Sequence, residues 1–421
     1  MYGPSLELIN YARRFNANWV VVASIGHKTP KWPLDDPPVF MPEYEKLAPF
    51  RKPFRGRIAK RRKDIRELIR AAKKAGMKAI FHAYEPSLPD GFQQAYPRLH
   101  CKAGNQYAKK APGLAEDIRE VCVSRPEVRE ALAVKVAETC RALPDLDGYM
   151  YSNNEGSTRT QVWHRCERCK DIPFSRMMKH LDDAMTEGIR RSGKNIRLFN
   201  RCWGTHETQQ QYWLNLKMRA EFGVAELQDK SWLPEYVESH RPANMRFNPK
   251  RDIPAFVRML KGGQTAFVYK ATWADVNLHH PLNPWMGKYG GHDEICEFSF
   301  EHCVRGPRNF HIMGREMQRR ARLCRRKGVE GICCVPINWG AHDSNRVSAH
   351  PSKWSLNELN VFLFAALVAD PDANLQKAAG NYLRRRYGSK LPGELAVMLL
   401  DTENVAANAM NLGGPRVSGG G

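Results

Sequence analysis

Residues 64–83 read DIRELIRAAKKAGMKAIFHA, and this stretch contains the unit from which the fold can be predicted. Its apolar residues recur at the spacing of one helix face: Ile65, Leu68, Ile69 and Ala72. The basic residues of the surrounding stretch, 51–78, fall on the other faces. Gly76 is typical of a residue that ends a helix, and the apolar run 77–83 follows it directly. The stretch therefore predicts a surface helix that leads into a buried strand.

The same order of helix and strand recurs along the chain. Ser124 and Glu127, with Pro126 between them, predict a capping box that opens a helix ending near Leu143. A basic helix at 315–327 precedes another apolar run. Eight strand-like runs are found, at 19–24, 78–83, 148–152, 196–202, 224–227, 265–270, 295–300 and 331–337.

Short apolar runs separated by helices predict the parallel strands of an α/β fold, a (β/α)8 TIM-type barrel. The rival is an open doubly wound sheet, but no glycine-rich phosphate loop follows any of the runs, which weighs against its nucleotide-binding forms. Ser355 and Glu358 predict another capping box, after which the chain is helical. We expect a barrel domain over 1–350 and a short helical carboxy-terminal extension over 351–421 that packs on it, with a flexible tail from about 412.

Composition limits the class of protein. The longest apolar run, 361–369, is far shorter than the roughly 20 residues that cross a bilayer. The first residues lack the layout of a secretory signal. Eleven cysteines, an odd number scattered through predicted strands and helices, favour free thiols in a reducing compartment. These features predict a soluble, cytoplasmic protein without a membrane partner.

The chain is strongly basic, with a net charge of +22. Three explanations compete: binding to nucleic acid, attraction to an acidic substrate or polymer, and a solvated basic surface. The basic residues fall mainly on the predicted outer helices, whereas a nucleic-acid binder is expected to interleave them with aromatic residues on one face. We therefore regard nucleic acid as an unlikely partner, and the other two explanations stay open.

Polar and aromatic residues gather where the predicted strands end, which is where barrels of this kind build their active sites. The candidates are Tyr151, Asn154, Glu155, Arg201, Trp203, Lys270, Trp273, Asp275, Glu297 and Trp339. Hydrolysis of a glycoside needs one protonated carboxyl and one ionised carboxylate, and tryptophan faces pack on sugar rings. Each charged residue taken singly is more often part of an ion pair that stabilises a strand end. Together, at consecutive strand ends, they favour a sugar site.

Four segments carry a likeness to a known family. Asn153-Asn154-Glu155-Gly156 matches a segment Asn-Ser-Glu-Gly, Lys270 precedes Asp275 by five residues, and Glu297-Phe298-Ser299 is similar to Glu-Leu-Gln. Arg201 corresponds to an arginine in a Trp-Arg-Ala-Phe strand. In this order and spacing, the segments resemble the alpha-glucuronidases of glycoside hydrolase family 67, over residues from about 7 to 388. The family's amino-terminal domain has no counterpart in the likeness.

The resemblance implies an enzyme that removes glucuronic acid from xylan fragments with inversion and without a cofactor. It implies that Glu155 is the general acid and that Asp275 and Glu297 hold and activate the water. Arg201 and Lys270 would bind the carboxylate of an acidic oligosaccharide. The remaining substrate-binding candidates are Tyr151, Asn154, Trp203, Trp273 and Trp339, of which Tyr151 replaces a uronate-binding lysine of the family. A non-catalytic carbohydrate-binding barrel is the alternative.

Cys166 and Cys169, preceded by His164, have the spacing of one half of a zinc site. No second pair with suitable spacing is evident, since Cys333 and Cys334 are adjacent within a predicted strand. We expect a reduced pair and no metal.

Overall fold

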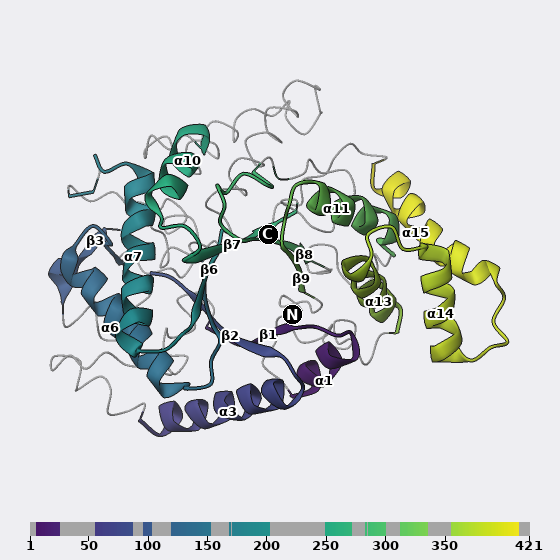
Figure 1. Cartoon of the computed structure of the whole chain (residues 1–421), viewed down its shortest axis with the longest axis horizontal. Helices are drawn as coiled ribbons and strands as arrows, with labels where there is room; N and C mark the ends of the chain where they lie inside the picture. Colours follow the sequence, from purple (N-terminus) through teal and green to yellow (C-terminus); the bar gives the residue numbers. More distant parts are fainter. Residues whose placement is uncertain are drawn as a thin grey trace.

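The computed structural model describes residues 6–25, 55–86, 96–102, 119–152, 168–169, 171–202, 249–271, 283, 285–299, 312–335 and 355–411. Within them, seven parallel strands curl around a common axis and form the wall of a TIM-type barrel (Figure 1). In sheet order they are β1 (Trp19–Ile25), β2 (Lys78–Tyr84), β5 (Gly148–Ser152), β6 (Arg197–Arg201), β7 (Thr265–Lys270), β8 (Glu294–Ser299) and β9 (Gly331–Val335). The predicted α/β barrel class is confirmed.

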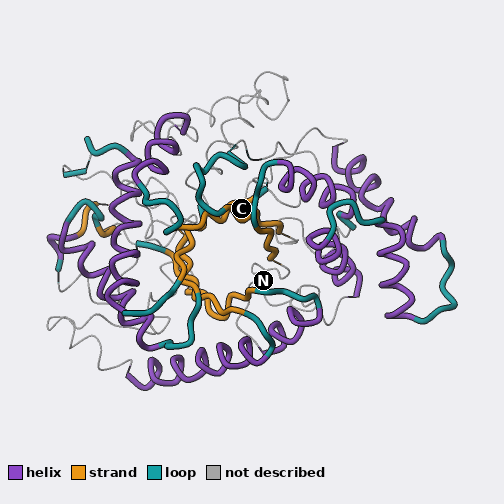
Figure 2. Tube along the Cα trace, viewed as in Figure 1, coloured by secondary structure: helices purple, strands orange, loops and turns teal. Residues whose placement is uncertain are grey.

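Helices surround the strands, as Figure 2 shows. They are α1 (Leu6–Arg14), α3 (Arg55–Lys74), α6 (Pro126–Ala142), α7 (Phe174–Ser192), α10 (Pro249–Met259), α11 (Gly314–Arg326), α13 (Ser355–Ala369), α14 (Leu375–Tyr387) and α15 (Glu394–Asn411). A 3-10 turn, η3 (Pro97–Leu99), precedes a small antiparallel pair, β3 (His100–Lys102) and β4 (Arg119–Val121). None of the helices in the described ranges is long and apolar enough to span a membrane.

Most strands lie where the sequence predicts them. The strands at 148–152 and 265–270 have the predicted bounds, and the other strands of the seven-stranded sheet begin within a residue of prediction. The small pair β3 and β4 was not predicted. The predicted strand at 224–227 lies outside the described residues, and β6 pairs directly with β7, from Leu198 opposite Thr265 to Arg201 opposite Val268.

Side chains alternate between the two faces of the sheet, which are both buried. Outward side chains pack under the helices in the main core, whereas one small cluster contains strand residues only and fills the barrel interior. Its buried members are Val21, Ile80, Met150, Phe199, Ala266 and Val268. Gly148 is required beside this cluster, because a Cβ there would lie 2.7 Å from Cε2 of Phe199.

The predicted capping box at Ser124 is wrong by one residue. Helix α6 begins at Pro126, its N-cap is Arg125, and no side chain caps it. Proline suits the first helical position because its fixed φ fits the helix and it lacks an N–H that would need a partner. The Ser124 hydroxyl instead lies 2.8 Å from Sγ of Cys122.

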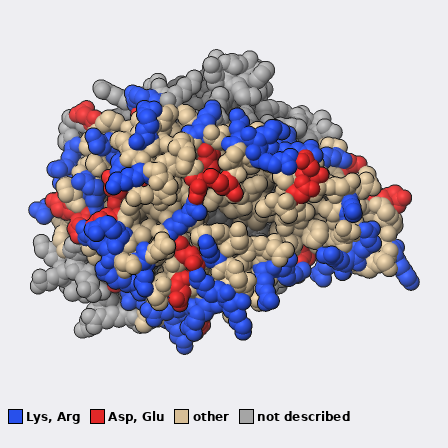
Figure 3. Space-filling view, viewed as in Figure 1, with Lys and Arg blue, Asp and Glu red and all other residues tan. Residues whose placement is uncertain are grey.

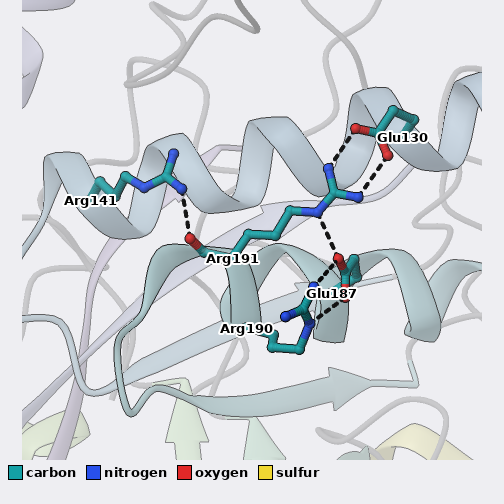
Figure 4. Close-up of polar contacts among 5 residues, drawn as sticks. All are labelled: Glu130, Arg141, Glu187, Arg190 and Arg191. Carbon is teal, nitrogen blue, oxygen red and sulfur yellow. Dashed lines mark hydrogen bonds and ion pairs between the residues drawn. The ribbon is translucent and has the colours of Figure 1, made fainter.

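Helices α6 and α7 are linked on the surface by Arg191, as Figure 4 shows. Its guanidinium donates to Glu130 of α6 (Nη2–Oε2, 2.8 Å) and to Glu187 of α7 (Nε–Oε1, 2.7 Å). Arg141 donates to the backbone carbonyl of Arg191 at 2.6 Å. Exposed pairs of this kind contribute only about 0–1 kcal/mol each, so the apolar contact beneath them provides most of the stability.

The carboxy-terminal helices attach at the start of α11. Glu403 of α15 accepts hydrogen bonds from the backbone N–H groups of Arg315 (2.9 Å) and Glu316 (2.8 Å). Asn360 of α13 accepts one from the N–H of Met313. Helix α13 also contacts α1, through an ion pair between Arg14 and Glu358 (2.7 Å). The division of the chain at residue 350 stays a prediction.

Lysine and arginine side chains spread over much of the viewed face, with acidic side chains between them (Figure 3). On α11, Arg322 and Arg325 are exposed and pair with Asp372 at 2.7 and 2.5 Å. This arrangement agrees with the predicted placement of the basic residues on the outer helices.

Candidate active site

A layer of polar side chains lies at the carboxyl ends of the strands, next to the apolar interior cluster and on the same face of the sheet. Five neighbouring strands supply it: His82 (β2), Ser152 (β5), Arg201 (β6), Lys270 (β7) and Glu297 (β8). All five residues are buried, and Glu297 is 0% exposed. Because the strands are parallel, their carboxyl ends meet at one end of the barrel and bring these side chains together.

Arg201 and Glu297 form the centre of the layer. The guanidinium donates from Nε to Oε2 at 2.7 Å and from Nη2 to Oε1 at 2.8 Å. The two residues lie on β6 and β8, so the long arginine side chain reaches across β7. A bidentate, charge-assisted pair of this kind fixes both the position and the plane of the carboxylate.

Lys270, on the intervening strand β7, also lies beside this carboxylate. It is the register partner of Glu297, and its Nζ is 3.5 Å from Oε1. Among Arg201, Lys270 and Glu297, two cations therefore meet one carboxylate in a buried setting, where electrostatic interactions are stronger than in water. The three together have an excess of positive charge.

His82 extends the layer to β2. Its Nε2 is hydrogen-bonded to the Ser152 hydroxyl at 2.8 Å, and that hydroxyl accepts from Nη1 of Arg201 at 3.4 Å. Burial, and secondarily the charge of Arg201, hold the pKa of His82 well below its ordinary value of 6.5. The imidazole is therefore neutral at pH 7.

Three of the predicted site residues, Arg201, Lys270 and Glu297, come together here. Sequence reasoning missed His82 and Ser152. The available signal was alternation: Ile80 faces the barrel interior, so residue 82 of the same strand faces it too. Two of the three guanidinium nitrogens of Arg201 bond Glu297, and the predicted role of Arg201 in binding a substrate carboxylate stays a prediction.

Tyr151 requires a correction. It is predicted to contact substrate, but its ring lies in the main core and its hydroxyl donates to Oδ1 of Asp182 on α7 at 2.7 Å. Neighbours along a strand face opposite sides of the sheet, so with Ser152 facing the interior, Tyr151 must face the helices. Six other candidates lie outside the described residues: Asn154, Glu155, Trp203, Trp273, Asp275 and Trp339.

The cysteine pair is only half described. Cys169 is buried, and Cys166 lies outside the described residues. Over the parts of the chain that the structure describes, no three His, Cys, Asp or Glu side chains are grouped so that they could hold a metal ion.

Comparison with known proteins gives structural neighbours only. No protein-family model and no curated protein sequence matches the chain. A glycoside hydrolase family 138 enzyme that targets pectin rhamnogalacturonan II aligns over 96% of this chain and 40% of its own length, with 10% identity and a TM-score of 0.56.

Two further neighbours have lower scores. An O-GlcNAc hydrolase mutant from Thermobaculum terrenum aligns over 92% of this chain and 62% of its own, with 9% identity and a TM-score of 0.48. A family 20 exo-beta-N-acetylglucosaminidase from Vibrio harveyi aligns over 95% and 55%, with 12% identity and a TM-score of 0.45. The chain thus spans less than two thirds of the length of each of these three proteins. All three are glycoside hydrolases, none is a family 67 alpha-glucuronidase, and the likeness to the first shows that the chain shares its fold.

Proposed function

We propose that this chain is a glycoside hydrolase whose active site lies at the carboxyl ends of the barrel strands. The observation that supports this most directly is the buried group Arg201–Glu297–Lys270, at the end of the barrel where TIM-barrel enzymes bind and convert substrates. A carboxylate held in one orientation by a bidentate arginine is suited to act on a water or a sugar, because its position is fixed before substrate arrives.

The proposed reaction is an inverting hydrolysis. Glu155, just beyond β5, would protonate the leaving oxygen, while Glu297 and Asp275, on β8 and just beyond β7, would hold and activate the water. An inverting enzyme separates its acid and base by roughly 6.5–9.5 Å to leave room for that water. Two strands, β6 and β7, stand between β5 and β8 in the sheet, which favours the wider separation.

The proposed substrate is an oligosaccharide that bears a uronic acid. Arg201 and Lys270 both lie beside Glu297 at the end of the barrel where substrates bind, and cations there can bind the carboxylate of a sugar by charge-assisted hydrogen bonds. Lys270 is the proposed partner of that group, while Arg201 mainly holds Glu297. The segments that resemble the alpha-glucuronidases support glucuronate and xylan fragments as the first compounds to try.

A panel of uronic-acid and neutral oligosaccharides tests the proposal. We expect turnover of at least one uronate substrate, a product of inverted anomeric configuration by proton NMR, and loss of at least ~100-fold in kcat for Glu155→Gln and Glu297→Gln. Glu294→Gln is the matched control: this buried glutamate on the same strand binds Tyr269 and the backbone N–H groups of Gly287 and Tyr289, away from the site. A product that retains configuration would exclude the roles given to Asp275 and Glu297.

A non-catalytic carbohydrate-binding barrel is the second candidate. The observation in its favour is that Glu297 is engaged by both Arg201 and Lys270, an arrangement that would also serve a fixed binding site. Binding of uronate sugars without turnover, unaffected by Glu155→Gln, would favour this candidate.

A further inference from the structure

We propose that His82 is a positioning residue of this site, which holds Arg201 through Ser152 and thereby fixes Glu297. The inference rests on the proposed function and extends the site by a strand that no sequence motif marks. His82 belongs to an apolar run of the sequence, where a histidine is easily taken for a core residue.

The contacts form one continuous hydrogen-bond network across the mouth of the barrel. It runs from Nε2 of His82 to the Ser152 hydroxyl (2.8 Å), from that hydroxyl to Nη1 of Arg201 (3.4 Å), and from Nε and Nη2 of Arg201 to Glu297 (2.7 and 2.8 Å). All three guanidinium nitrogens are therefore directed, two to the carboxylate and one to the serine. This hydrogen-bond network links four strands, β2, β5, β6 and β8.

The neutral state of His82 suits this role. The charged groups that act on it are Arg201, which disfavours the imidazolium, and Glu297, which favours it. Because the imidazole is buried and uncharged, it adds a hydrogen bond beside Arg201 without repelling the guanidinium. A lysine or a second arginine at this position could not do so.

Loss of His82 should loosen this hydrogen-bond network, starting at the end farthest from Glu297. The Ser152 hydroxyl would lose its fixed orientation, and the arginine, whose side chain has several rotatable bonds, would no longer be held on its third nitrogen. Glu297 would then be less constrained and its charge less well compensated. Such a change acts on the chemical step more than on sugar binding.

The variants His82→Leu and Ser152→Ala test this with the full chain and its best uronate substrate. Both should lower kcat by between ~10-fold and ~100-fold, the upper figure being the cost of a 1 Å misplacement. KM should change little. Both should move the acid limb of the pH–rate profile to higher pH, since a carboxylate with a looser cationic partner takes up a proton more readily. His82→Gln places an amide nitrogen near the position of Nε2 and should restore both the rate and the profile.

The matched control is His292→Leu. His292 is a buried histidine at the opposite ends of the strands, where its Nδ1 is hydrogen-bonded to the carbonyl of Thr265 at 3.1 Å. Removing it also empties a buried imidazole site, but it should leave kcat and the pH profile unchanged. If His82→Leu and Ser152→Ala keep the wild-type acid limb, or if His82→Gln is no better than His82→Leu, the inference is overturned.

A double-mutant cycle separates this inference from the proposed function. His82→Leu and Glu297→Gln, alone and together, are compared by urea unfolding, which needs no activity. A non-additive effect supports the link between the two residues, and additive effects overturn it. Absence of turnover by the wild-type chain on every sugar would instead overturn the proposed function, and the cycle would still decide whether His82 is coupled to Glu297.

Discussion

Glu85, Lys135 and Tyr149 form a second buried charged group, on the outer face of the sheet under α6. Nζ of Lys135 donates to Oε2 of Glu85 at 2.6 Å, and the Tyr149 hydroxyl donates to Oε1 at 2.9 Å. Burial lowers the pKa of Lys135 despite the adjacent carboxylate. This group faces the helices rather than the barrel interior, so we assign it to stability and not to catalysis.

Removing one partner of this pair should be costly. Lys135→Met leaves the carboxylate buried and uncompensated, and we expect it to lower the free energy of unfolding by about 3–5 kcal/mol in urea. The double variant Lys135→Met/Glu85→Gln should recover most of that loss. If the double variant is as unstable as the single one, the loss comes from packing and not from an unpaired charge.

The buried carboxyl of Asp182 should make the free energy of unfolding depend on pH. Its carboxylate accepts hydrogen bonds from Tyr151 and Thr265, but burial raises its pKa from 3.8 to about 6. The folded chain therefore binds this proton more tightly than the unfolded chain does. The stabilisation that the protonated Asp182 carboxyl gives the folded chain is fully present below pH 3.8 and is lost as pH rises through about 6. Urea midpoints between pH 4 and 7 should fall for the wild type and stay flatter for Asp182→Asn; parallel curves would contradict the assignment.

The residues of the candidate site could be predicted in part. Arg201, Lys270 and Glu297 were accessible from sequence because each charge interrupts an apolar run at a strand end. Tyr151 was misplaced because proximity to a strand end does not specify the face, which only alternation from a known interior residue decides. His82 was missed because its partner Ser152 lies 70 residues away, and no local pattern announces that contact.

At the scale of elements, close contact between α6 and α7 depends on Gly188. A Cβ built there would lie 2.5 Å from Cβ of Val136 and 2.6 Å from the backbone oxygen of Ala133. In a helix interior, alanine is more favourable than glycine by ~1 kcal/mol. A backbone oxygen, however, cannot move aside as a flexible side chain can. The clash should therefore outweigh the gain in propensity.

Gly188→Ala should accordingly destabilise the fold by about 1–3 kcal/mol, the usual range for overpacking. Gly380→Ala in α14 is the control, because its nearest neighbour is the guanidinium of Arg384 at 3.4 Å, which can shift. Thermal unfolding of the two variants should move in opposite directions. Equal shifts would mean that the α6–α7 contact relaxes freely.

Glu403 supplies the N-terminal cap that α11 lacks from its own sequence. No side chain caps α11 at Met313, and Glu403 binds the N–H groups of Arg315 and Glu316 instead. Glu403→Ala should cost about 0.5–2 kcal/mol, as for other lost caps, and should speed amide exchange at these two positions. Unchanged exchange there would show that water replaces the carboxylate without penalty.

Element bounds were predictable where local chemistry decides them. The strands 148–152 and 265–270 were recovered because their apolar runs start and stop sharply. The start of α6 was missed because two local signals conflict: Ser124 favours a cap, and Pro126 favours the first helical position one residue later. A cap whose acceptor lies 88 residues away, as Glu403 does from the N–H of Arg315, has no local signal at all.

For the whole molecule, repetition made the barrel predictable. Each helix-then-strand unit is a weak indication, but several in succession, without a nucleotide-binding loop, agree only with a small set of folds. Strand pairing was less accessible, since the direct contact of β6 with β7 depends on tertiary packing. The substrate is less accessible still, because one fold hosts many reactions and the site residues decide among them.

The net charge of +22 leads to the last prediction, which separates long-range attraction from local recognition. If the proposed uronate substrate is correct, the basic outer helices should speed its capture, and kcat/KM should fall as salt rises from 0.01 to 0.15 M, where the Debye length shrinks from ~30 to ~8 Å. A neutral oligosaccharide should show no such dependence. Lys270→Met should reduce kcat/KM for the uronate by roughly 10–100-fold, the loss of one charged hydrogen bond, because it removes the local cation.

The salt slope of Lys270→Met should nevertheless match that of the wild type, since one buried cation contributes little to a field produced by many surface charges. A slope that disappears with Lys270 would place the whole electrostatic effect at the site. Equal salt dependence for acidic and neutral sugars would show that the basic surface has no part in substrate capture, and a solvated basic surface would then be the remaining explanation for the charge.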